Sequence, residues 1–275
     1  MKSLEPAIPR RGSSDLRATL VSFGREVLAI ADGELRKLRR DPTEVFTRSI
    51  QPILWLLVFG QVFTRVRAIP TGPLRYLDFM APGVLAQSVL FTAIFYGIAI
   101  IWERDLGIVH KMLVSPAHRS ALVLGKAASA GVRGIAQTVI IYVVTLCMGI
   151  DVRLTPLPVL GVLVAVLLGS AVFSTFSLTI ACIVKTRERF MGIGQVLTMP
   201  LFFASNAIYP IEMMPGWLRT LARGNPLTYL VDALRALMIA GGRSELGLGA
   251  DLGVELATLI VLVFIAGKIY PSVIR

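Results

Sequence analysis

Long apolar stretches alternate with short charged segments along the chain, and this pattern predicts a bundle of membrane-spanning helices. A helix needs roughly 20 apolar residues to cross a bilayer core about 30 Å thick. Six stretches approach that length and hold almost no acidic residues. The predicted fold is therefore all-α, an integral membrane protein with six transmembrane helices at about 48–64, 79–102, 133–150, 157–184, 190–211 and 252–269.

Two prolines indicate where these helices are irregular. Pro52 stands near the start of the first stretch and suits a first helical turn, where its missing N–H leaves no hydrogen bond unmade. Pro200 lies in the middle of the fifth stretch, and Asn206 follows near its end. We therefore expect a kink or a break in the fifth helix.

The residues before the first span divide into two parts. Residues 1–22 have no apolar core, so they are neither a signal peptide nor a span and are expected to form a disordered cytoplasmic tail. Residues 23–42 predict an amphipathic helix along the inner membrane surface. This helix either anchors the topology or packs on a cytoplasmic partner, and Asp32 with Gly33 could instead mark a turn between two shorter pieces. The transmembrane domain then occupies residues 43–275.

Composition supports the membrane assignment and sets the orientation. Hydrophobic residues make up 55% of the chain, charged residues 16%, and the mean hydropathy is +0.73, which excludes an ordinary soluble domain. With the amino terminus inside, 20 of the 28 Lys and Arg residues fall on the cytoplasmic side. Both termini are thus predicted to be cytoplasmic. The net charge of +11 then reflects topology and anionic lipid, and no nucleic-acid partner is expected.

The sequence offers no support for catalysis or metal binding on this chain. Cys147 and Cys182 lie in different spans, and His110 and His118 have no ligand cluster around them. Gly125 and Lys126 form a GK pair, but the remaining residues of a phosphate-binding loop are missing. We therefore predict no catalytic residue, no metal site and no ATP hydrolysis by this chain itself.

Ion coupling is also disfavoured, because acidic residues at mid-membrane mark ion pathways. The cores of the six predicted spans contain none. Glu255 lies near an outer end and Arg133 near an inner one. A secondary transporter is thus the weaker hypothesis, and energy for transport would come from outside the membrane.

A charged, part-helical segment, residues 103–119, separates the second and third spans. Leu106, Val109 and Leu113 recur at helical spacing, and Pro116 closes the segment. One interpretation is a cytoplasmic loop that obeys the positive-inside rule. The other is a short helix, parallel to the membrane, that a soluble motor protein could grip.

Several motifs resemble one family of membrane proteins. They are QPILWLLVFGQVF in the first span, APGVL in the second, ERDLGIVHKMLVSPAHRSALVLGK after it and SNAIYPIEMMPGWLRTLARGNPLTYLVDALR near the fifth. Their order and spacing resemble the membrane subunit of ABC-2 type exporters, and are most similar to the daunorubicin-resistance-type permeases. The resemblance runs from about Asp41 to the last span.

The resemblance implies a partner and a docking site. In that family a coupling helix between spans two and three docks into a separate ATP-binding subunit, which carries ATP and Mg, and two permease chains join two ATPase chains. The amphipathic helix before the first span helps to cradle the ATPase. His110 departs from the acidic residue that related sequences often place there. The matching coupling residues are Glu103, Arg104, Gly107, Leu113, Pro116, Arg119, Gly125 and Lys126.

Two short helices are expected between spans five and six. One lies within residues 209–225, and the second covers about 226–240 and is too short and too charged to span. Asp232 and Arg235 can pair on one face of the second helix. The resemblance implies re-entrant helices that close the exit, whereas the pattern alone also fits a packed extracellular cap. The candidate residues are Asn206, Pro210, Pro215, Trp217, Asn225 (as N-cap), Pro226, Asp232 and Arg235.

Aromatic residues supply the candidates for a substrate pathway, because binding pockets are rich in aromatic side chains. The same residues could equally face lipid or neighbouring helices. The candidates are Phe91, Phe95, Phe173, Phe176, Phe202 and Phe203.

Together these observations predict the permease subunit of an ATP-driven exporter in a bacterial inner membrane. Its cargo would be a hydrophobic or amphipathic small molecule such as a drug, antibiotic or lipid-like compound. A polysaccharide or glycolipid exporter, an ion-coupled carrier and a purely structural subunit are the alternatives. The expected partners are an ABC ATP-binding subunit, a second permease chain as homodimer or heterodimer, and membrane lipid.

Overall fold

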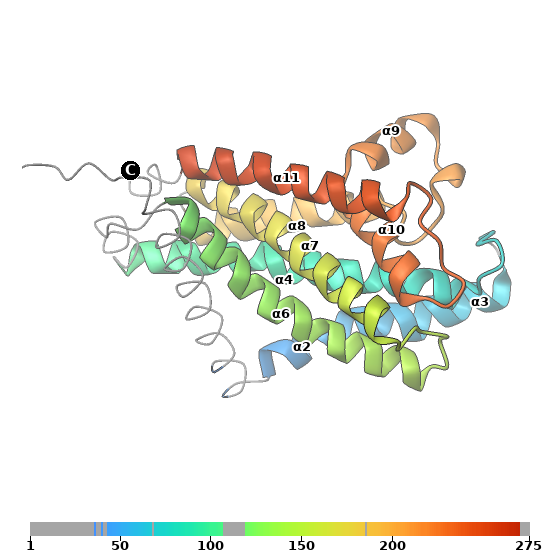
Figure 1. The fold of residues 1–275 in the computed structure, drawn as a ribbon. Helices are drawn as coiled ribbons and strands as arrows, with labels where there is room; N and C mark the ends of the chain where they lie inside the picture. Colours follow the sequence, from blue (N-terminus) through green and yellow to red (C-terminus); the bar gives the residue numbers. More distant parts are fainter. Residues whose placement is uncertain are drawn as a thin grey trace, which may run out of the picture.

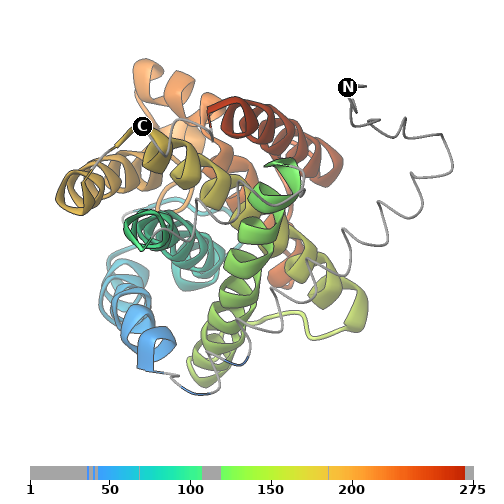
Figure 2. The same cartoon turned by 90° about the vertical axis from the view of Figure 1, so that its left-hand side faces the viewer.

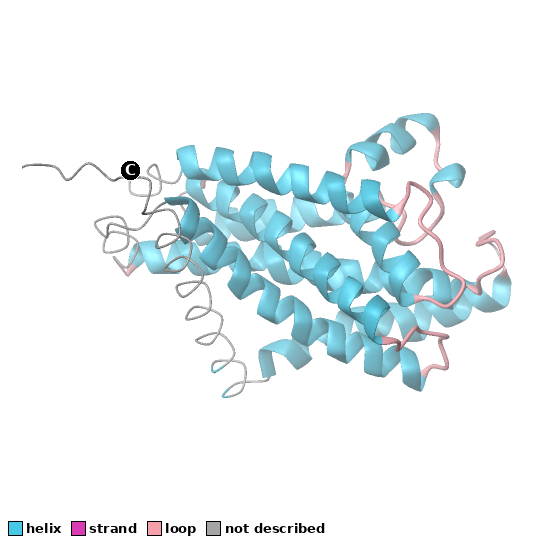
Figure 3. Ribbon diagram, viewed as in Figure 1, coloured by secondary structure: helices cyan, strands magenta, loops and turns pink. Residues whose placement is uncertain are grey.

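The computed structural model describes residues 36, 40, 43–67, 69–106, 119–184 and 186–269. These residues form helices joined by turns, and no strand occurs among them apart from an isolated bridge between Val152 and Ile239 (Figure 3). The predicted all-helical class is confirmed at this level. The predicted tail and most of the predicted amphipathic helix lie outside the described residues.

The long helices lie side by side along one axis (Figure 1). Within the described residues, five helical stretches are long and apolar enough to cross a membrane: Phe46–Val66, Tyr76–Phe95, Ala127–Cys147, Pro156–Ile183 and Leu248–Ile269. The elements that contain them are α2 (Thr43–Leu54) with η1 (Trp55–Gly60) and α3 (Gln61–Val66), then α4 (Tyr76–Asp105), α6 (Arg119–Cys147), α7 (Pro156–Ile183) and α11 (Leu248–Ile269).

The fifth of the six predicted spans is shorter than expected. The helix in that place, α8 (Arg187–Phe203), has 17 residues and ends within one turn of Pro200. The segment 204–210 that follows is made of turns. The predicted break near Pro200 is therefore confirmed, and the helix does not extend to residue 211 as predicted.

The expected place of Pro52 in a first helical turn is wrong. Pro52 lies inside α2, which has already begun at Thr43, and its side chain is buried. A proline in a helix interior removes one backbone hydrogen bond, and the π-helical η1 begins three residues later. Pro52, Leu56 and Gly60 are buried at intervals of four residues, so they form the face of the first span that packs inward.

Helix α4 lies at the centre of the bundle (Figure 2). It contacts α2, α6, α7, α8 and α10 (Pro226–Met238), and Met80, Leu85 and Leu90 have no exposed surface. Helix α11 lies at the periphery, where Ile260 and Phe264 are more than 60% exposed. Large exposed apolar side chains on a spanning helix are suited to contact with lipid.

Two glycines let other segments approach α4 closely. A Cβ on Gly97 would lie 2.1 Å from Ser177 Oγ, and one on Gly83 would lie 2.4 Å from the carbonyl oxygen of Ala207. Ser177 also donates a hydrogen bond to the Ile94 carbonyl. Small residues at such positions allow helix backbones to pack tightly within a membrane.

Candidate functional site

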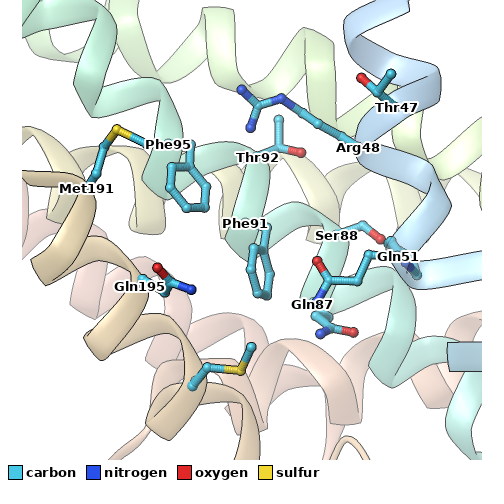
Figure 4. Close-up of a pocket in the computed structure, with 12 residues that line it drawn as sticks. Thr47, Arg48, Gln51, Gln87, Ser88, Phe91, Thr92, Phe95, Met191 and Gln195 are labelled. Atoms are coloured by element: carbon cyan, nitrogen blue, oxygen red, sulfur yellow. The ribbon is translucent and has the colours of Figure 1, made fainter. Parts of the chain in front are cut away.

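A cavity of about 370 Å³ opens between α2, α4 and α8 (Figure 4). The volume lies within the range of small-molecule sites, roughly 300–1,000 Å³. All three helices contribute side chains, so the site depends on the bundle rather than on one segment. The lining residues are Thr47, Arg48, Gln51, Pro52, Gln87, Ser88, Phe91, Thr92, Phe95, Met191, Gln195 and Met199.

Aromatic and sulfur-containing side chains form the apolar part of the lining. Phe91 and Phe95 lie one turn apart on α4, with their ring centroids 6.2 Å apart. Met191 lies opposite, on α8, and Met199 of the same helix also lines the cavity. Methionine adapts its shape easily and packs well against aromatic rings, so this wall suits a flat apolar ligand.

The cavity brings together only some of the predicted pathway residues. Phe91 and Phe95 line it. Phe173 is buried in the hydrophobic core, and Phe202 packs against Trp55 with centroids 6.0 Å apart. The remaining two, Phe176 and Phe203, do not belong to the lining either.

Polar groups occupy the other part of the lining. Gln87 is 2% exposed, and neither its Nε2 nor its Oε1 has a hydrogen-bond partner. Ser88, its neighbour on α4, donates its hydroxyl proton to the Val84 carbonyl at 2.9 Å. The sequence analysis did not predict Gln87. The signal was available, since an amide inside an apolar span is costly and therefore marks a functional position.

Among the described residues that line the cavity, Arg48 is the one charged side chain, and there is no carboxylate. The Arg48 guanidinium lies 5.9 Å from the centroid of the Phe95 ring. This distance is near the outer limit of a cation–π contact. The cavity therefore combines an aromatic wall, neutral hydrogen-bonding groups and a positive charge.

Three of the eight predicted coupling residues lie outside the described part of the chain, and the other five lie within it. Gly107, Leu113 and Pro116 are outside it. The backbones of the other five are helical: Glu103 and Arg104 end α4, and Arg119, Gly125 and Lys126 begin α6.

The end of α4 is tied to the start of α8 beside these coupling residues. Arg187 donates to Asp105 Oδ2 at 2.8 Å, and its guanidinium lies 3.8 Å from the Trp102 ring centroid. Both side chains of the ion pair are more than a third exposed, so the pair contributes little to stability. The pair matters for the arrangement of the helices, because it joins the end of α4 to the start of α8, and both helices line the cavity.

The opposite end of the bundle carries the short helices predicted between the last two spans. They are η2 (Ile211–Met213), α9 (Gly216–Gly224) and α10. Asn225 caps α10 as predicted: its Oδ1 accepts from the Leu227 N–H at 3.0 Å, and Pro226 is the first helical residue. Its Nδ2 also donates to the carbonyl oxygens of Leu201 and Ala204, at 2.6 and 2.8 Å. Asn225 thus fixes α10 to the end of α8.

Asp232 and Arg235 form the predicted pair on α10, with Arg235 Nη1 3.7 Å from Asp232 Oδ1. Arg235 also donates to the Asn206 carbonyl at 2.6 Å and lies 3.8 Å from the Phe79 ring centroid. Burial lowers the pKa of Arg235 to about 10, so the guanidinium remains charged at neutral pH.

The other predicted residues of this end differ in exposure: Pro210 is buried, whereas Pro215 and Trp217 are exposed.

Two acidic residues of α11 were not predicted as part of this region. Asp251 and Glu255 lie one turn apart and are 0% and 1% exposed. Asp251 Oδ2 is 2.8 Å from Ser244 Oγ, whereas neither carboxylate oxygen of Glu255 has a hydrogen-bond partner. Their spacing of four residues places both carboxylates on one helix face, and this was the signal in the sequence.

The described residues contain no group of three or more His, Cys, Asp or Glu side chains that could hold a metal ion, and both histidines lie outside them.

Comparison with known proteins gives the family. Residues 25–239 match the ABC-2 type transporter family. The chain belongs to this family. Because ABC-2 permeases are transport subunits that do not themselves catalyse a reaction, the chain is a multi-pass membrane permease rather than an enzyme.

Named relatives of this ABC-2 permease support the assignment. The chain is 26% identical over 266 residues to the putative transport permease ycf38 of Cyanophora paradoxa, covering 92% of this chain and 90% of the relative. It is 25% identical to the daunorubicin resistance ABC transporter permease protein DrrB1 of Streptomyces coeruleorubidus, covering 84% and 77%. It is also 25% identical to nodulation protein J of Rhizobium leguminosarum bv. trifolii, covering 69% and 71%. The resemblance to drug-resistance permeases is thus confirmed.

Proposed function

We propose that this ABC-2 permease is the membrane subunit of an ATP-driven exporter that moves a hydrophobic or amphipathic small molecule outward. The cavity between α2, α4 and α8 is the observation that carries the proposal. It has the volume of a small-molecule site, an aromatic wall and an opening at the surface of the subunit. In this proposal the chain spans a bacterial inner membrane six times, α8 being the short span, with both termini in the cytoplasm.

In the proposed assembly two permease chains join two ATP-binding subunits, which hold ATP and Mg. Large apolar side chains are exposed on α2 and η1 beside the cavity, among them Phe46, Ile50 and Phe59, and Val196 is exposed on α8. A second permease chain covering these helices would enclose the cavity. Alternating access would then expose it to one side of the membrane at a time.

The proposed coupling site lies where α4 ends and α6 begins, at residues 103–126. Movement of an ATPase docked here would reach the cavity through two of its walls, because Asp105 and Arg187 join α4 to α8. The proposed outer gate lies at the opposite end, in the segment 204–240 that contains α9 and α10. Asn225 and Arg235 connect this segment to α8 and α4.

The coupling site is tested by the double substitution Glu103→Ala with Arg104→Ala. We expect the variant to lose co-purification with the ATPase, and the stimulation of ATP hydrolysis by the permease to fall by at least about tenfold, as for the loss of interface hot spots. Asp151→Asn, an exposed acidic residue in the loop between α6 and α7, is the matched control and should behave as wild type. Unchanged association and stimulation in the double variant would contradict the proposed coupling site.

An ion-coupled carrier is the second candidate, and the burial of Asp251 and Glu255 favours it. Buried ionisable groups in a spanning helix often mark proton pathways. In the exporter, ATP-driven transport should persist when Glu255 is replaced by Gln, since the amide has the same shape. Loss of transport in Glu255→Gln, together with uptake driven by a pH gradient in vesicles without ATPase, would favour the carrier.

A further inference from the structure

We infer that the cavity between α2, α4 and α8 selects an uncharged amphipathic ligand whose polar end both donates and accepts hydrogen bonds, and that Gln87 is the residue that determines this selection. The inference rests on the proposed function and names the chemical class of its substrate. An aromatic or other flat apolar body would lie against Phe91, Phe95 and the two methionines.

The unmet hydrogen bonds of Gln87 carry the argument. The side chain forms part of the inner wall of the cavity, and its Nε2 and Oε1 both lack partners. An amide offers two donor hydrogens on nitrogen and two acceptor lone pairs on oxygen. A buried amide is satisfied only when a partner supplies both kinds of group, and leaving either unpaired is costly.

Three classes of ligand meet this requirement differently. An ammonium ion only donates, so it would leave Nε2 of Gln87 unpaired. A carboxylate only accepts, so it would leave Oε1 unpaired. A neutral amide, or a hydroxyl beside a carbonyl, can pair with both atoms at once. Gln51 and Gln195, on α2 and α8, repeat the same chemistry at the exposed part of the cavity (Figure 4).

Charge further disfavours a cationic ligand. No acidic residue stands among the twelve lining residues, and Arg48 is positive. A cation that enters the cavity without a counter-charge among these twelve residues loses hydration that the neutral polar groups of the lining replace only in part. A carboxylate could pair with Arg48 at the exposed part of the cavity. A carboxylate at the buried part would instead place its negative oxygens beside the Gln87 carbonyl oxygen, and two acceptors repel each other.

The test uses three probes with one fluorescent body: 2-(naphthalen-2-yl)ethylamine, its N-acetyl derivative and 3-(naphthalen-2-yl)propanoic acid. They carry a cation, a neutral amide and a carboxylate respectively. Binding is measured by fluorescence anisotropy to the complete permease–ATPase complex in lipid nanodiscs without ATP, and the signal of empty nanodiscs is subtracted. Comparing variants with wild type for each probe removes differences in lipid partitioning.

The expected result is a preference of at least about fivefold for the acetamide, the value of one net hydrogen bond. Gln87→Leu should weaken acetamide binding by about five- to tenfold and change the other two probes by less than twofold. Gln87→Glu should shift the preference toward the amine. Gln61→Leu, an equivalent substitution on the exposed surface of α3, should leave the ranking unchanged.

Two outcomes would overturn the inference. One is a wild-type complex that binds the amine or the carboxylic acid as tightly as the acetamide. The other is an equal loss of all three probes in Gln87→Leu, which would show a packing role. If Gln87→Leu fails to fold, the inference is still tested by the order in which the wild-type complex binds the three probes and by the change of that order in Gln87→Glu.

Failure of the proposed function gives a different result. If the proposed function is wrong but the inference holds, the complex still binds the acetamide in preference to the other two probes, but ATP does not drive transport of the acetamide.

Discussion

Three hydrogen bonds join the Asp232 carboxylate to the segment before α11. Its Oδ2 accepts from the Ser244 hydroxyl at 3.0 Å and from the backbone N–H groups of Glu245 and Leu246 at 2.8 and 3.1 Å. Its other oxygen faces Arg235. A carboxylate can serve all these donors because both of its oxygens only accept. Asp232 therefore joins α10 to the turn before α11.

Asp232→Asn should lower the free energy of unfolding by about 2 kcal/mol, because the amide keeps one acceptor oxygen and leaves Arg235 without its counter-charge. The measurement is thermal unfolding of the purified permease in detergent. Glu212→Gln, on the exposed surface of the same end, should change stability by less than about 0.5 kcal/mol. Equal stability of Asp232→Asn and wild type would contradict the role given to this network.

Individual residues were predictable where local sequence decides the structure. The Asn225 cap with Pro226 behind it, and the Asp232–Arg235 pair, depend on spacings of one to three residues. The burial of Gln87, Asp251 and Glu255 depends on which neighbouring helix covers them, and the sequence of one helix does not contain that information.

At the scale of elements, the packing of α4 against its neighbours sets the shape of the bundle. Gly83 on α4 faces the backbone of Ala207, where a Cβ would lie 2.4, 2.7 and 2.9 Å from the carbonyl oxygen, Cα and carbonyl carbon. A backbone contact cannot yield as a flexible side chain can. This close approach places the segment 204–210, and with it Asn206, against the central helix.

Gly83→Ala should destabilise the permease by about 2 kcal/mol, as expected for overpacking against a rigid backbone. Gly192→Ala is the matched control, since nothing lies within 4 Å of a Cβ added at Gly192 on α8. The control should be neutral or stabilise by up to about 0.8 kcal/mol through helix propensity. Thermal unfolding of both variants in one detergent gives the comparison, and equal effects would refute the close approach.

Element boundaries followed the hydrophobic pattern closely where a span is uninterrupted. The predicted span 157–184 and α7, Pro156–Ile183, agree within one residue at each end. The pattern was less informative at prolines. Pro52 is accommodated inside a helix that continues through π-helical η1, whereas α8 ends three residues after Pro200. A proline alone does not distinguish these outcomes, because neighbouring helices determine whether the freed backbone group is satisfied.

At the scale of the whole molecule, the proposed coupling site and outer gate lie at opposite ends of the bundle, and the cavity lies in the wall between α2, α4 and α8. The ion pair Asp105–Arg187 links two cavity helices beside the coupling site. Asn225 links one of them to α10 at the far end. We therefore expect ATP hydrolysis on a partner to change the cavity by moving α4 and α8 together relative to α2, the third wall of the cavity.

Transport in reconstituted vesicles tests this account most directly. The permease and its ATPase are placed in inside-out vesicles, and uptake of N-acetyl-2-(naphthalen-2-yl)ethylamine is followed with ATP or a non-hydrolysable analogue. We predict uptake that requires ATP hydrolysis and both proteins, and that falls at least about tenfold with Glu103→Ala and Arg104→Ala together. Uptake by the permease alone, driven by a pH gradient and unaffected by ATP, would contradict the account.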